Sequence, residues 1–112
     1  MEDRKEIILA KGIKGIIVYA KHNSSPNQNW ILLIDKVDDD TMSSYDDMIY
    51  THVSHCLGTK TTYFEDSPRW GWVNKMGFSF YEATEEEKKI INDLLKNRGL
   101  KYVKGINKVF KR

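Results

Sequence analysis

The chain is poor in the residues that cross-link a protein or anchor it in a membrane. It has one cysteine, Cys56, and two prolines among its 112 residues. One cysteine excludes an internal disulfide, which is typical of proteins from a reducing cytoplasm. The longest apolar runs, such as Gly15–Ala20 and Ile31–Ile34, are far too short to span a bilayer, and no secretory signal pattern is visible. We therefore expect a cytoplasmic protein with no membrane partner.

Motifs of nucleotide-dependent and nucleophilic enzymes are also missing. The segment Gly12–Gly15 is too short for a Walker motif and leads into a predicted strand, where a phosphate loop requires a helix. His52, His55 and Cys56 do not complete a four-ligand metal site, and on a strand the two histidines would point to opposite faces. We interpret them as surface histidines and a packed cysteine. The sequence predicts no enzyme, no metal and no cofactor.

One helix can be predicted with a clear start and end. Thr84 is a good N-cap whose hydroxyl can accept from the backbone N–H of Glu87, while the Glu87 carboxylate reaches back to the Thr84 N–H in a capping box. Gly99 supplies a left-handed residue after the last turn. Between them runs an apolar stripe at helical spacing, which we expect to pack on a sheet. Its members are Ile90, Ile91, Leu94 and Leu95.

The rest of the chain predicts strands and turns within a single domain, residues 1–112. The expected strands are Ile7–Ala10, Ile16–Ala20, Trp30–Val37, Met48–Val53, Thr59–Phe64 and Phe78–Tyr81, followed by Leu100–Val103 and Ile106–Phe110 after the helix. The first two should form one hairpin and the last two another. We expect an α+β fold with a curled antiparallel sheet or small open barrel, one C-terminal helix and a terminal hairpin.

Charge is distributed unevenly although the net charge is only +2. The segment Asp35–Asp66 contains eight acids and two bases, whereas the tail after Gly99 contains five bases and no acid. Such polarity either creates a surface that attracts phosphates or lets two parts of the fold attract each other. The acidic run Asp38–Asp47 lacks the order of a calcium loop, so we interpret it as a solvated loop.

A binding site is suggested by aromatic residues beside basic ones. Trp70 and Trp72 flank a glycine in a polar segment with Arg69, and aromatic faces next to arginine suit a stacked base with a nearby phosphate. Lys101 and Lys104 are the expected phosphate contacts. The alternative is that such aromatic residues belong to the core, as is usual for Phe78 and Phe80 on one face of a strand.

The segment F-Y-E-A-T-E-E-E-K-K-I-I-N-D-L-L-K-N-R-G-L-K-Y-V, residues 80–103, resembles the C-terminal signature of small phage and prophage proteins from gut-type bacteria. In those proteins a tyrosine-rich strand leads into a capped helix, a glycine, an aromatic strand and a lysine-rich end. The resemblance covers about the last third of the chain. It implies an origin in a mobile element, where small accessory proteins often bind and block host defence, and it transfers no catalytic residue.

Our first hypothesis is a non-enzymatic phage-type protein that inhibits a bacterial antiviral defence system, by sequestering a nucleotide signal or by blocking a defence protein. The alternative is a small nucleic-acid-binding domain that uses the basic C-terminal region. An enzyme that uses His52, His55 or Cys56 ranks last. An exposed edge strand and a tryptophan-rich loop leave a homo-oligomer open.

Overall fold

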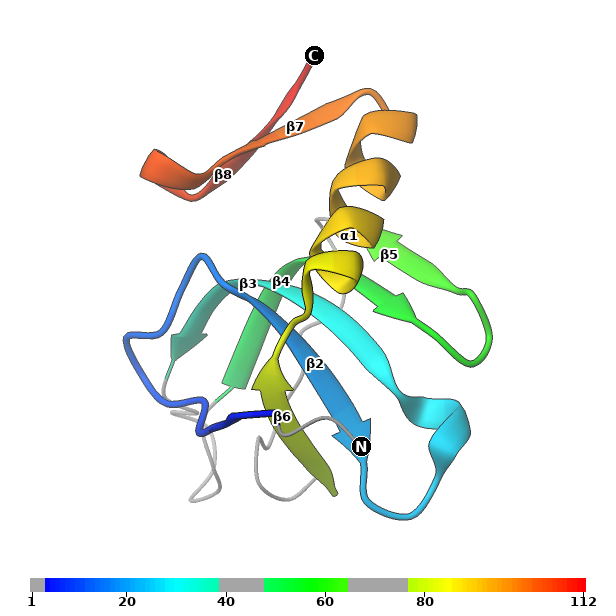
Figure 1. The fold of residues 1–112 in the computed structure, drawn as a ribbon. Coiled ribbons are helices and arrows are strands. Elements are labelled where there is room, and N and C mark those ends of the chain that lie inside the picture. Colours follow the sequence, from blue (N-terminus) through cyan, green and yellow to red (C-terminus); the bar gives the residue numbers. More distant parts are fainter. Residues whose placement is uncertain (1–3, 39–47, 65–76) are drawn as a thin grey trace.

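The computed structural model describes residues 4–38, 48–64 and 77–112. In these residues, six strands form one antiparallel sheet in the order β1-β6-β2-β3-β4-β5 (Figure 1). The strands are β1 Glu6–Ile7, β2 Ile17–His22, β3 Trp30–Asp38, β4 Met48–Cys56, β5 Thr62–Phe64 and β6 Phe78–Glu82, with a short 3-10 helix at Pro26–Gln28. Helix α1, Glu85–Asn97, precedes a second sheet made of β7 Leu100–Val103 and β8 Lys108–Lys111, joined by a 3-10 turn at Lys104–Ile106. The α+β prediction is confirmed, and the large sheet stays open rather than closing into a barrel.

The core is organised around β3, whose side chains are buried on both faces of the sheet. Ile31 and Leu33 pack with Val53 of β4 beneath the helix. Leu32 and Ile34 point to the opposite face and join a second cluster there. The other buried members of that cluster are Leu9, Val18, Ala20, Val37, Ile49 and Phe80. The apolar run of β3 therefore belongs to a central strand, as its sequence predicts.

Helix α1 begins and ends where its sequence predicts. Both hydrogen bonds of the capping box between Thr84 and Glu87 are present, and Gly99 has a φ of +73° just after the last turn. Ile91 and Leu95 are buried against the sheet. Glu87 also accepts two hydrogen bonds of 2.9 Å from the Arg4 guanidinium, so one carboxylate caps the helix and ties down the N-terminal segment.

The predicted N-terminal hairpin is wrong. Strand β1 is only two residues long and pairs with β6, whereas β2 lies between β6 and β3. The glycine-containing segment between β1 and β2 runs beside β3 instead of forming a tight hairpin turn. Its backbone exchanges hydrogen bonds with β3 through Gly15 to Ile34 at 2.8 Å and through Val37 to Ile13 at 3.2 Å. These bonds satisfy the backbone groups that a hairpin would otherwise have paired.

Other strand boundaries also differ from the sequence expectation, and those of β4 and β5 each differ by three residues. Strand β4 continues through His55 and Cys56, because both residues pair with β3. Strand β5 starts at Thr62 because Lys60 has a φ of +63° in the preceding turn. Of the predicted acidic loop Asp38–Asp47, Asp38 belongs to β3 instead, and residues 39–47 lie outside the described residues.

The turn between β4 and β5 packs tightly against the 3-10 helix at Pro26–Gln28. A Cβ atom added at Gly58 would lie 2.9 Å from the carbonyl carbon of Asn27 and closer still to its oxygen. The neighbouring Leu57 N–H donates to the Asn29 carbonyl at 2.8 Å. Because the obstacle is backbone rather than a flexible side chain, the turn has no room for a larger residue.

Gly58→Ala should therefore destabilise the protein by about 2 kcal/mol through overpacking. Gly105→Ala is the matched control, since a Cβ there meets nothing within 4 Å, and its effect should stay within about 0.5 kcal/mol. Urea unfolding of both variants measures the difference. Equal stabilities would contradict the close packing of this turn.

Candidate functional site

Two irregularities in the β3–β4 ladder place a pair of polar residues side by side. The register shifts between Leu33 and Ile34 and again between Ile34 and Lys36, which leaves His52 of β4 and Asp35 of β3 outside the regular pairing. The His52 Nε2 atom lies 3.5 Å from the Asp35 carboxylate. Bulges commonly redirect a side chain, and here the redirected His52 ring contacts Tyr102 of the terminal hairpin.

Asn107 joins the hairpin to this irregular part of the sheet. Its side-chain amide donates to the Asp35 carbonyl at 2.7 Å, and its side-chain oxygen accepts from the Tyr102 hydroxyl at 2.8 Å. The same oxygen lies 3.1 Å from His52 Nε2. Asn107 has a φ of +49°, a left-handed conformation that asparagine tolerates better than most residues. One side chain thus makes the polar connection between the two sheets.

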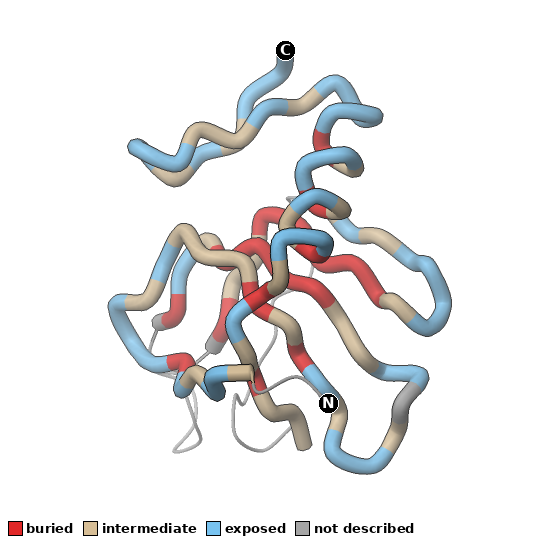
Figure 2. The backbone as a smooth tube through the Cα atoms, in the orientation of Figure 1, coloured by how far each residue is buried: buried red, intermediate tan, exposed pale blue. Residues whose placement is uncertain are grey.

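Tyr102 acts in this network as a neutral phenol. Burial raises the pKa of Tyr102, and the nearby Asp35 carboxylate raises it further, so its hydroxyl remains a hydrogen-bond donor. It packs over Gly15, where an added Cβ would lie 3.1 Å from the hydroxyl oxygen. Apart from this network and a few apolar contacts the hairpin is solvated, because each of its residues is exposed or half-buried (Figure 2).

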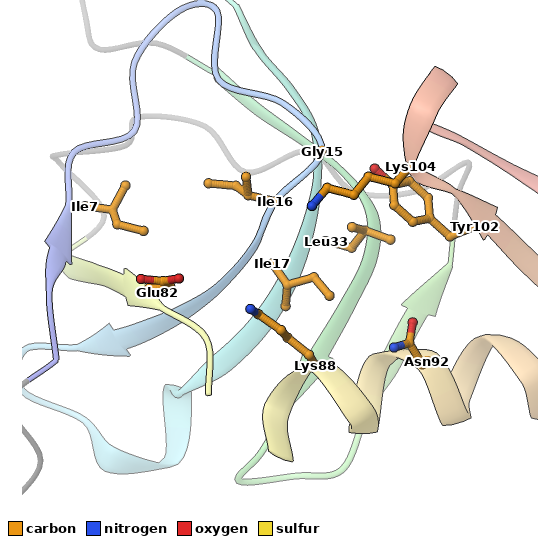
Figure 3. A pocket seen from close by; sticks show the side chains of 10 residues that line it. All are labelled: Ile7, Gly15, Ile16, Ile17, Leu33, Glu82, Lys88, Asn92, Tyr102 and Lys104. Carbon is orange, nitrogen blue, oxygen red and sulfur yellow. The ribbon is translucent and has the colours of Figure 1, made fainter. Parts of the chain in front are cut away.

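A cavity of about 410 Å³ lies where the sheet, the helix and the hairpin meet (Figure 3). Its apolar wall comes from the sheet and from the segment before β2. Its polar groups come from the end of β6, from one face of the helix and from the hairpin. The lining residues are Ile7, Gly15, Ile16, Ile17, Leu33, Glu82, Lys88, Asn92, Tyr102 and Lys104.

The charges at this cavity are two lysines and one carboxylate. Lys104 is exposed at the hairpin turn, and Lys88 lies one helical turn before Asn92 on the same face. Lys88 makes one ion pair, 3.6 Å long, with the solvent-exposed Glu85. Such an exposed pair is weak and easily exchanged for another partner. The cavity therefore offers an apolar wall with a net positive rim, which suits a small anion that has an apolar body.

The outward face of the hairpin forms a separate basic surface. The register Lys101↔Phe110 and Val103↔Lys108 puts these four side chains on one face, opposite the face of Leu100, Tyr102 and Val109 that packs toward the helix. Phe110 is 44% exposed between the two lysines. We call Lys101, Val103, Lys108 and Phe110 the outer hairpin face.

The structure separates the residues that the sequence grouped into one site. Lys104 lines the cavity, whereas Lys101 lies on the outer hairpin face. Arg69, Trp70 and Trp72 lie outside the described residues, so their role stays a prediction. Sequence reasoning missed Glu82, Lys88 and Asn92. Lys88 and Asn92 are four residues apart in the predicted helix, and this spacing, which places both on the same helix face, was the available signal.

The interpretation of the two histidines as surface residues is wrong. His52 is 4% exposed and His55 8% exposed. The bulge breaks the strand alternation, so both lie on the side of the helix and the hairpin instead of on opposite faces. His55 Nδ1 is 2.7 Å from the Thr62 hydroxyl, and burial, with a smaller contribution from Lys60, lowers the pKa of His55. In the part of the chain that the structure describes, no group of acids, histidines and cysteine is arranged to hold a metal ion.

Cys56 is packed, as expected, and is 1% exposed. Burial raises the pKa of its thiol, but hydrogen bonds from Thr59 and Gly58 outweigh burial and bring the pKa below its ordinary value. The thiol lies 3.5 Å from the Asn27 carbonyl oxygen.

No protein-family model matches the chain, and the searches of curated proteins and of solved structures return no match either. Among the described residues, no helix combines the length and the apolar character needed to cross a membrane.

Replacement of Asn107 should release the hairpin from the sheet. Asn107→Gly keeps the left-handed backbone accessible but removes the side-chain bonds to Asp35 and Tyr102, which should lower the free energy of local opening by about 2 kcal/mol. Hydrogen exchange should then be faster at β7 and β8 and unchanged at β3. Tyr102→Phe, which loses one bond, should give a smaller effect in the same place. Unchanged exchange in β7 and β8 would contradict the role of Asn107.

Proposed function

We propose that this chain is a non-enzymatic, phage-type binding protein that holds a nucleotide in the cavity between sheet, helix and hairpin. The observation that supports the proposal is the combination of an apolar wall, which includes Ile17 and Leu33, with Lys88 and Lys104 at the rim. The cavity volume of about 410 Å³ falls within the range of roughly 300–1,000 Å³ typical of small-ligand pockets.

A nucleotide fits these features better than a purely polar anion. Its base presents a flat, weakly polar face that can lie on aliphatic side chains such as Ile16 and Ile17. Its phosphate can form ion pairs with the ammonium groups at the rim, because lysine binds phosphate as a mobile point charge. The ammonium group of Lys104 makes no hydrogen bond or ion pair with another described residue, so a phosphate would not have to displace a partner from it.

The biological role that we propose is inhibition of a bacterial antiviral defence system by sequestration of a nucleotide signal in the host cytoplasm. This role depends on the resemblance of residues 80–103 to small phage and prophage proteins. Inhibition by occupying a defence protein is the other version of the same hypothesis. The two versions differ in whether the purified protein binds a nucleotide on its own.

Thermal melting with mono-, di- and cyclic nucleotides tests the nucleotide version, because a ligand that binds the folded state raises its apparent stability. For a nucleotide that binds, Lys104→Gln should weaken affinity about tenfold by removing a charged hydrogen bond. Lys108→Gln on the outer hairpin face is the matched control and should leave affinity unchanged. Binding of the corresponding nucleoside should be insensitive to both changes. The absence of any nucleotide-dependent shift would refute sequestration.

As a second candidate, we propose that the outer hairpin face binds single-stranded nucleic acid. This proposal is supported by the exposed Phe110 between Lys101 and Lys108 on a tail that contains no acid. An exposed aromatic ring can stack on a base while the lysines neutralise adjacent phosphates. The hairpin lies above the large sheet beside α1 (Figure 1), and its outer face is opposite the side chains that pack toward the helix.

Phe110→Ala should weaken the binding free energy for a short single-stranded oligonucleotide by about 1–3 kcal/mol, because the stacking contact with one base is lost. The salt dependence should remain, since the lysines are unchanged. Lys108→Gln should instead make the dependence on salt shallower by releasing one counterion fewer. Tyr63→Ala, at an exposed tyrosine of β5, is the control and should leave affinity unchanged. Fluorescence anisotropy at two salt concentrations measures both effects, and salt-independent binding would refute this candidate.

A further inference from the structure

The polar groups of the cavity belong to two ends with different chemistry. Lys104 and Tyr102 enter from the hairpin, and Glu82 lies on the β6 side, with Ile16 and Ile17 between them (Figure 3). One end is cationic and can hold an anion. The other end presents a carboxylate, which when ionised can only accept hydrogen bonds.

Glu82 is held in place by its backbone although its side chain is exposed. It is paired with Val18 of β2, and its backbone N–H donates to the Lys5 carbonyl at 3.3 Å. Its carboxylate makes no hydrogen bond or ion pair with another described residue. A ligand that fills the cavity would bring its far end to this carboxylate, and the end that fits must carry N–H donors.

We infer that the nucleotide held in this cavity carries an exocyclic amino group on its base, which donates to Glu82 while the phosphate contacts Lys104. This inference rests on the nucleotide-binding function proposed above. Adenine fits the requirement because its amino group is a donor at the edge of the ring. Hypoxanthine has a carbonyl oxygen at the same place, which cannot donate to the carboxylate, and its N1–H donor lies at the neighbouring ring position, so the base would have to shift to reach Glu82.

Lys88 supports the same orientation from the helix. It reaches toward the middle of the cavity, between the carboxylate end and the hairpin end (Figure 3). Its ammonium group can bind the phosphate or remain paired with Glu85. Lys88 therefore adds positive charge to the cavity without distinguishing the Glu82 end from the Lys104 end. The difference between the ends therefore depends on Glu82 and Lys104.

Isothermal titration calorimetry with AMP and IMP tests the inference, because the two nucleotides differ in the exocyclic group of the base that Glu82 would contact. We expect AMP to bind about tenfold more tightly than IMP, as one hydrogen bond to a charged acceptor contributes that much discrimination. Glu82→Gln should bring the ratio close to one, since a side-chain amide can accept from the amino group or donate to the carbonyl. Glu86→Gln, at an exposed glutamate in the first turn of α1 that does not line this cavity, is the matched control and should keep the wild-type ratio.

The Lys104→Gln variant separates the two ends. It should weaken AMP and IMP equally and preserve the ratio between them. Equal affinity of the wild-type protein for AMP and IMP, or a ratio that Glu82→Gln does not change, would overturn the inference and leave nucleotide binding standing. Failure of both nucleotides to bind would overturn the inference together with the proposed function.

Discussion

The structure depends on the burial of β3 on both faces of the sheet. Four consecutive side chains, Ile31–Ile34, are almost completely inaccessible to water, which requires a layer on each side. The helix covers one face through Ile91 and Leu95, and the segment before β2 contributes Leu9 to the other face. Burial of each such aliphatic side chain contributes about 1.5–3 kcal/mol. Residues 12–16 hydrogen-bond to β3 and Leu9 packs on its second face, so this segment contacts β3 instead of folding into a local hairpin.

The terminal hairpin is attached on a different physical basis. Its inward side chains reach only the margin of the helix-side cluster, and its specific connection is the polar bridge from Asn107 to Asp35 and Tyr102. That bridge depends on the β3–β4 bulges, because regular pairing would leave Asp35 and His52 in the ladder. The cavity in turn depends on the hairpin, which supplies Lys104 and Tyr102. A local irregularity in two central strands thus positions a distant segment and shapes the site.

The elements that local chemistry determines could be predicted from the sequence. The helix follows from Thr84, Glu87 and Gly99, and the terminal hairpin follows from two short apolar runs around a glycine. The position of β1 could not be predicted. Its partner β6 lies about seventy residues later in the chain, and pairing over that distance depends on the tertiary fold and not on local sequence. The cavity could not be predicted from the sequence either. Glu82, Lys88 and Lys104 come from a strand end, a helix and a turn, and Lys104 reaches the other two only because Asn107 attaches the hairpin to the large sheet.

The weak attachment of the hairpin gives ligand binding a structural consequence. A ligand that contacts Lys104 on the hairpin and Glu82 on the large sheet bridges two parts of the fold, and its binding free energy adds to that of the Asn107 bridge. At a ligand concentration of 100 times the dissociation constant this linkage amounts to about 2.7 kcal/mol. That is comparable with the hydrogen bonds that hold the hairpin without ligand. The hairpin is therefore the part of the chain whose local stability should respond most to an occupied cavity, while the core around β3 should respond least.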